Sequence, residues 1–106
     1  MFKKRFRLPK NVRFAKENQI SSNFFLIKIA ENKTESKRFG IIVSKRIDKR
    51  AVIRNKIKRQ IRRCIEENEN NVPAGKDILM IVRPNIKDRQ MEEICESIKK
   101  IFKKII

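Results

Sequence analysis

The sequence predicts an α+β fold: a small mixed sheet covered by three helices, in a single domain spanning residues 1–106. Three observations lead to this fold class. Short runs rich in Ile, Val and Phe predict strands. Two longer segments carry apolar residues at helical spacing. Polar and charged stretches separate these segments and give the order helix, strand, strand, helix, strand, helix. A chain of 106 residues buries only a small core.

The N-terminal half holds the first three elements. Asn11 is a residue type that caps helix N-termini, and a short helix is predicted at 12–19. A turn at 21–23 separates this helix from a strand at 24–30, and a polar segment leads to a second strand at 38–45. Because the two strands follow each other closely in sequence, we expect them to form an antiparallel hairpin.

The C-terminal half contains the more regular helices. A helix is predicted at 50–67, and a polar loop follows it. The run at 77–84 is almost wholly apolar, which is typical of a strand covered on both faces. The order strand, helix, strand predicts that this run lies parallel to the strand at 38–45. The last helix, at 91–105, has apolar residues at every third or fourth position.

The charge balance is the most informative bulk property. The chain has 29 Lys and Arg against 12 Asp and Glu, a formal net charge of +17. Such an excess repels itself in a compact state unless an anion neutralises it. Nucleic acid is the first candidate, because its phosphates bind many cations at once, and an anionic membrane is the second. The membrane is disfavoured because no apolar run approaches the roughly 18–20 residues of a spanning helix.

The helix at 50–67 combines an apolar stripe with a cationic face. At 100° per residue, five side chains fall within about a third of the circumference: Ile53, Ile57, Ile61, Cys64 and Ile65. Lys and Arg gather on the opposite side, and residues 49–65 contain no acid. A solvated surface usually mixes both signs of charge. The absence of acids, and the repulsion between like charges four residues apart, favour an anion-binding face.

The other candidate sites are weak. Cys64 and Cys95 lie on apolar helix sides, and we expect reduced thiols that pack as small core residues. The sequence has no His and no Cys-X-X-Cys pair, which disfavours a zinc site and protein-based hydrolysis. Gly40, inside a strand, indicates a bulge or close packing rather than a ligand contact. Residues 1–10 lack the apolar stretch of a secretory signal, so a cytoplasmic location is expected.

The cationic helix and its neighbours resemble the protein subunit of bacterial ribonuclease P. The family's RNR motif is an Arg-Asn start followed by a Lys-Arg pair and further Arg, and it stands here as RNKIKRQIRR. The segments RLPKNVRF and RFGIIVSKR before it, and DILMIVRP after it, resemble other family segments in the same order. The resemblance covers nearly the whole chain.

The resemblance implies a role in tRNA processing. The family's catalyst is a large RNA, which itself holds most of the Mg²⁺. The protein, one copy per RNA, binds this ribonuclease P RNA and the 5′ leader of precursor tRNA, and assists endonucleolytic removal of the leader. It contributes no catalytic residues and no metal ligands. The resemblance also implies a left-handed strand–helix–strand crossover, against the usual rule, and a fold related to a ribosomal-protein domain.

Two sets of site residues follow from the resemblance. The positions implied to bind the catalytic RNA are Lys45, Arg46, Arg54, Asn55, Lys56, Lys58, Arg59 and Arg62. A leader cleft between the first helix and the sheet is assigned to Phe14, Phe25 and Ile27, since stacking and charge suit a substrate of varied sequence. A core role is the alternative for both Phe residues. Asn18 and Ile27 stand where family members often have aromatics, so the cleft is expected to be more aliphatic.

Two other functions remain open at this point. A basic ribosomal protein would share the charge without a substrate of its own. A self-sufficient nuclease would cleave RNA without an RNA subunit.

Overall fold

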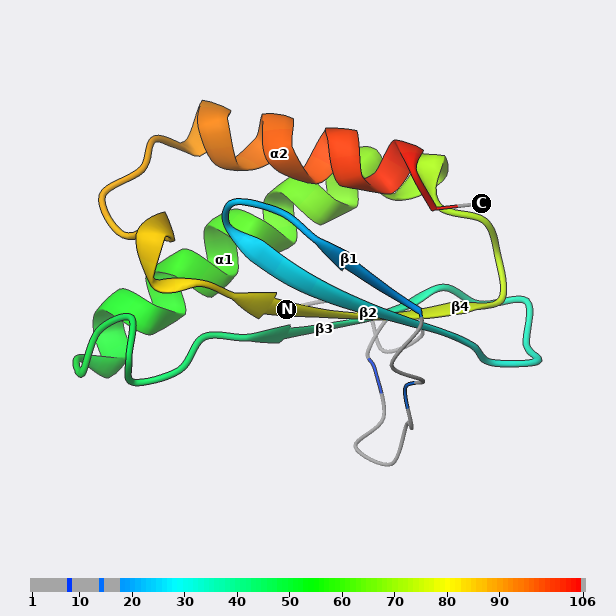
Figure 1. Ribbon diagram of the computed structural model, residues 1–106, viewed down its shortest axis with the longest axis horizontal. Coiled ribbons are helices and arrows are strands. Elements are labelled where there is room, and N and C mark those ends of the chain that lie inside the picture. The colour runs from blue at the N-terminus through cyan, green and yellow to red at the C-terminus, as the bar shows by residue number, and fades with distance from the viewer. Residues whose placement is uncertain (1–7, 9–13, 15–17, 106) are drawn as a thin grey trace.

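The computed structural model describes residues 8, 14 and 18–105 (Figure 1). These residues form four strands, two α-helices and two short 3₁₀ helices, which confirms the α+β class. Their bounds are β1 Gln19–Ser21, β2 Phe25–Glu31, β3 Arg38–Ile42, α1 Ala51–Asn68, η2 Glu69–Asn71, β4 Lys76–Val82, η3 Pro84–Ile86 and α2 Met91–Lys103.

The first predicted helix lies mostly outside the described residues. Of the range 12–19, the structure describes only Phe14, Asn18 and Gln19. Gln19 begins β1, a strand that the sequence analysis did not predict. β1 runs antiparallel to β2, and Ser22 closes the turn between them, because its backbone N–H donates to the carbonyl of Phe25 at 2.9 Å.

The four strands form one sheet in the order β1-β2-β4-β3. β4 runs antiparallel to β2 and parallel to β3, which confirms the parallel pair. The predicted hairpin between β2 and β3 is wrong, because β4 lies between them. The β2–β3 connection instead crosses the start of β4. There the Asn32 N–H donates to the Gly75 carbonyl, and the Gly75 N–H donates to the Ser36 carbonyl.

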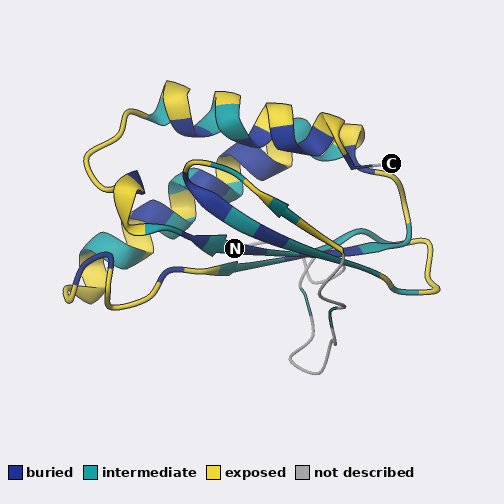
Figure 2. Ribbon diagram, in the orientation of Figure 1, coloured by how far each residue is buried: buried dark blue, intermediate teal, exposed yellow. Residues whose placement is uncertain are grey.

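The core lies between the sheet and the two α-helices. Figure 1 shows α1 and α2 on the same face of the sheet, and Figure 2 shows the buried residues on the surfaces that meet. From the sheet, Phe25, Ile27 and Phe39 point into this layer and are almost completely buried. The ring of Phe39 stacks on that of Phe102 from α2, with centroids 5.9 Å apart. Burial of these large side chains, at about 1.5–3 kcal/mol each, holds both helices against the sheet.

No described helix covers the opposite face of the sheet, which we call the open face. Because strand side chains alternate, the open face carries the residues between the core positions. They are Leu26, Lys28 and Ala30 of β2, Asp77, Leu79 and Ile81 of β4, and Arg38, Gly40 and Ile42 of β3. Ile42 is 44% exposed, so apolar surface remains accessible on this face.

The described N-terminal residue Leu8 lies against this face. Its backbone N–H donates to the Phe39 carbonyl at 3.0 Å. A Cβ placed on Gly40 would come within 2.8 Å of Leu8 Cδ2 and 3.1 Å of Leu79 Cδ1. The expected close packing at Gly40 is therefore confirmed, since the glycine leaves room for Leu8.

Cys64 and Cys95 form a disulfide, with their Cα atoms 5.2 Å apart. The expectation of reduced thiols is therefore wrong. Both residues were placed correctly on apolar helix sides, but their positions along α1 and α2 bring the sulfur atoms together where the helices pack. The bond joins the cationic helix covalently to α2.

Candidate nucleic-acid interface

The helix α1 is anchored by its apolar stripe. Ile57, Ile61, Cys64 and Ile65 are buried, and Ile53 packs partly buried against the same core. This confirms the helical phase predicted from the sequence. Since one side of the helix is fixed by packing, the other side presents its cations in a defined direction.

The outward side of α1 carries most of the predicted RNA-binding residues. Asn55, Lys56 and Arg59 are exposed, whereas Lys58 and Arg62 are half-buried. The structure brings these five side chains together on one helix surface, as the sequence predicted. Lys45 and Arg46 are exposed in the turn before the helix, where Ile47 is buried and anchors the turn. The structure leaves their contact with RNA as a prediction.

Arg54 has a different role from its neighbours. Its Nη1 donates to the backbone carbonyl of Asp48 at 3.0 Å and to that of Lys49 at 2.7 Å. The guanidinium therefore holds the connector that precedes α1, in addition to any contact with RNA. The sequence alone could not reveal these carbonyl contacts of Arg54.

Asp48 holds the start of α1 together. The Asp48 side chain is 4% exposed, and its Oδ1 accepts hydrogen bonds from the backbone N–H of Arg50 at 2.9 Å and from Arg50 Nε at 3.0 Å. Its Oδ2 lies 2.8 Å from Arg50 Nη2 and 3.3 Å from Lys87 Nζ. These hydrogen bonds, first those from the Arg50 side chain and then the one from its backbone, hold the pKa of Asp48 well below its usual range.

The open face is the second candidate surface. Phe25 and Ile27, expected to line a cleft, have 0% exposure and point into the core beneath the helices. The expectation that they form a cleft wall is therefore wrong, and for Phe25 the core alternative holds. Phe14 is half-buried. The alternation of β2 places Leu26 and Lys28 on the open face instead.

Sequence reasoning missed two cations associated with this face. Lys28 sits on the open face, next to Leu79 in the β2–β4 register. Arg83 follows β4, and its Nη2 donates to Ser21 Oγ at 2.7 Å. Side chains along a strand alternate between its two faces, which separates Lys28 and Arg83 from the neighbouring core positions. This alternation is the sequence signal that could have identified both cations.

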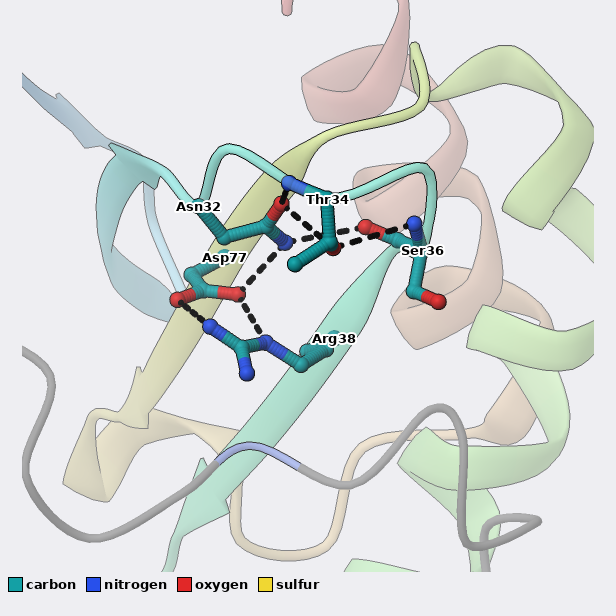
Figure 3. Close-up of polar contacts among 5 residues, drawn as sticks. All are labelled: Asn32, Thr34, Ser36, Arg38 and Asp77. Carbon is teal, nitrogen blue, oxygen red and sulfur yellow. Dashed lines mark hydrogen bonds and ion pairs between the residues drawn. The ribbon is translucent and has the colours of Figure 1, made fainter.

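A buried ionic network fixes one end of the open face (Figure 3). Asp77 is 1% exposed and accepts two hydrogen bonds from Arg38, at 2.6 Å from Nε and 2.7 Å from Nη2. Asn32 Nδ2 donates to the same carboxylate at 2.9 Å, and to the Ser36 carbonyl. The carboxylate raises the pKa of Arg38, mainly through the side-chain hydrogen bonds. Because Asp77 is fully engaged, it does not oppose an anion at the centre of this face.

Known proteins match both the sequence and this geometry. A family model described as Ribonuclease P matches residues 2–106. The chain belongs to the ribonuclease P protein family. The ribonuclease P protein component of Bacillus mycoides is 36% identical over 107 residues, which cover 96% of this chain and 92% of that protein.

Solved structures of the family share the fold. The Staphylococcus aureus RNase P protein is 34% identical, with a TM-score of 0.80 over 92% of this chain and 93% of the other. The protein from Thermotoga maritima is 25% identical, with a TM-score of 0.76 and 83% coverage of each chain. The predicted family, fold class and function as a protein subunit of ribonuclease P in tRNA processing are confirmed.

Proposed function

We propose that this subunit serves an RNA-catalysed ribonuclease P, binding the catalytic RNA through α1 and the 5′ leader of precursor tRNA on the open face. The observation that carries the proposal is the acid-free cationic surface at residues 49–65, presented by a helix whose other side is buried. Arg and Lys on such a fixed surface neutralise phosphates and release counterions when RNA binds. The holoenzyme would hydrolyse the phosphodiester that joins the leader to the mature tRNA.

The open face supports leader binding of low sequence selectivity. It combines aliphatic surface from Leu26, Ile42 and Ile81 with the cation of Lys28. Aliphatic side chains and point charges contact sugars and phosphates without reading base edges. A leader of variable sequence suits such a surface, and stacking would depend on Phe14.

Catalytic metal is assigned to the RNA in this proposal. Among residues 8, 14 and 18–105, no three His, Cys, Asp or Glu side chains are grouped as ligands for a metal ion. The Asp48 and Asp77 carboxylates are occupied by Arg and Lys partners. We therefore propose that the RNA holds Mg²⁺ and that the protein supplies binding and orientation.

The remaining parts of the proposal concern assembly and location. We propose one copy of the protein per RNA, acting in the cytoplasm. The described part of the chain contains no helix with the length and apolar character needed to cross a membrane.

A reconstituted processing assay tests the proposal. Precursor tRNA is incubated at low Mg²⁺ with a bacterial ribonuclease P RNA, with and without the protein, and with the protein alone. We expect cleavage at the leader junction to increase only when RNA and protein are both present. Absence of any increase would refute the proposal and favour a ribosomal role, whereas cleavage by the protein alone would identify a self-sufficient nuclease.

A single variant tests whether α1 binds the RNA. Arg59→Gln removes one exposed cation from the predicted contact surface. It should lower the slope of log affinity against log salt by about 0.7–0.9 for a lost phosphate contact. Lys99→Gln, which removes an exposed cation from α2, is the matched control and should leave the slope unchanged.

A further inference from the structure

A small hollow is lined by the first turns of α1, by residues 86–89 before α2, and by one residue of α2. Its volume is about 190 Å³. Four isoleucines line it, and Ile57, Ile86 and Ile94 are buried while Ile53 is half-buried. Gln60 also lines the hollow and supplies amide hydrogen-bonding groups. The site therefore offers apolar contact together with one polar side chain that can donate and accept.

The rim of the hollow is cationic. Arg50, Lys56 and Lys87 line it, and the last of these comes from a chain segment distant from the RNR motif. Arg50 and Lys87 share the single carboxylate of Asp48, which leaves one positive charge in excess. Lys56 is exposed and adds another. Asp88 is the acid on this rim, and it opposes an anionic ligand.

The remaining cation at the hollow is committed elsewhere. The Arg89 guanidinium lies 5.7 Å from the centroid of the Phe24 ring and 3.7 Å from Glu93. Arg50 is also held, by its side-chain hydrogen bonds to Asp48. We therefore assign anion binding to Lys56 and Lys87.

We propose that this hollow receives one unpaired nucleotide of the RNA that α1 binds, with the base against the isoleucines and the phosphate at Lys56 and Lys87. Its volume is below the roughly 300–1,000 Å³ of pockets for drug-sized ligands, and suits a single planar group. A free phosphate would use the rim but not the apolar lining. Lys56 belongs to both the rim and the cationic face of α1, so a bound strand would continue from one to the other.

The inference rests on the proposed function, because it takes the RNA bound by α1 as the source of the nucleotide. In the proposed function that RNA is the ribonuclease P RNA, and precursor tRNA is the alternative source that the binding experiments below distinguish. The inference adds a second chain segment, residues 86–89, to the RNA-binding surface. It also assigns Asp48 a positioning role, since its carboxylate fixes the side chains of Arg50 and Lys87 on either side of the hollow.

Titration of the wild-type protein with small ligands tests the hollow directly. Uridine 5′-monophosphate and inorganic phosphate are each added to isotope-labelled protein, and NMR shifts are followed. We expect the nucleotide to shift the Gln60 side-chain amide and the methyl groups of the four isoleucines, and phosphate to shift only the backbone amides of the rim. Identical shifts with the two ligands, or no saturable shift with the nucleotide, would overturn the proposal.

Two variants that should change RNA binding in opposite directions test the role of the hollow. Lys87→Gln removes a rim cation while Arg50 still holds Asp48, and it should lower the salt slope by about 0.7–0.9. Asp88→Asn removes the opposing acid and should tighten binding. Asn suits the positive φ of 65° at this position. Lys99→Gln is the control on α2. If Lys87→Gln and Asp88→Asn both behave like the control, the proposal is wrong.

The two RNAs are measured in separate binding experiments. An effect of Lys87→Gln confined to the ribonuclease P RNA identifies that RNA as the source, and an effect confined to precursor tRNA identifies the substrate. The failure of this inference is distinguishable from failure of the proposed function. If Arg59→Gln lowers the salt slope of RNA binding but uridine 5′-monophosphate gives no saturable shift, this inference fails and the proposed function stands.

Discussion

Reduction of the Cys64–Cys95 disulfide is expected to destabilise the fold substantially. The bond joins residues 31 positions apart, and the loop-closure relation gives about 3.7 kcal/mol from the entropy that it removes from the unfolded chain. At roughly 4 °C per kcal/mol for a domain of this size, the melting temperature should fall by about 15 °C. The effect matters for this chain because its +17 charge already works against compaction.

Urea unfolding with and without a thiol reductant measures this contribution. A Cys64→Ala/Cys95→Ala double variant is the control, and its unfolding midpoint should not respond to reductant. Added RNA or another polyanion should raise the free energy of unfolding of the oxidised and reduced forms by equal amounts, because this stabilisation depends on the affinity of the folded state. If mass spectrometry shows a fully reduced protein whose unfolding midpoint equals that of the oxidised form, the loop-entropy reasoning is refuted.

Three further predictions concern single residues. Asp48→Asn should lower the free energy of unfolding at pH 7, and the difference from wild type should shrink below about pH 4. The stability that comes from the lowered pKa of Asp48 is present above the pKa of this carboxyl in the unfolded chain, and it is lost as the pH falls further. Urea unfolding across pH checks this, and a difference that stays constant with pH would contradict it. Asp77→Ala should cost about 2–3 kcal/mol by leaving Arg38 without its carboxylate, whereas no loss in thermal unfolding would show the pair to be dispensable. Gly40→Val should cost about 1–3 kcal/mol through contact with Leu8, and adding Leu8→Ala should restore part of it; equal stability of the single and double variants would exclude that contact.

The sequence predicted those parts of the fold that depend on local periodicity. The helical phase of α1 separated Ile57 and Ile61 from the cations, and the structure buries both while exposing Arg59. The apolar run of β4 predicted the strand itself, and β4 is a central strand of the sheet. The predicted cover on both faces is not confirmed, because Leu79 and Ile81 are only half-buried on the open face, where no described helix lies. Periodicity sufficed here because burial of one side is a property of each element by itself.

Pairing between distant segments could not be predicted in the same way. Proximity in sequence suggested a β2–β3 hairpin, but β4 pairs with both strands and lies between them. Similarly, the alternation of β2 separated its two faces without showing which one the helices cover, so Phe25 was assigned to the wrong one. The disulfide and the contacts of Arg54 with backbone carbonyls likewise depend on three-dimensional position alone.

The position of β4 in the sheet has a consequence for how the chain folds during synthesis. β3 pairs only with β4 among the described strands, and β2 pairs with β4 along its whole length, from Phe25 opposite Val82 to Glu31 opposite Lys76. A growing chain that has just completed α1 can therefore form only the short β1–β2 pair, and its cationic helix has no finished sheet to pack against. Pairing across such sequence separations makes folding slow. Until β4 emerges from the ribosome, the nascent chain exposes a strongly basic helix beside unpaired strand edges, which is the state most open to capture by RNA or to aggregation.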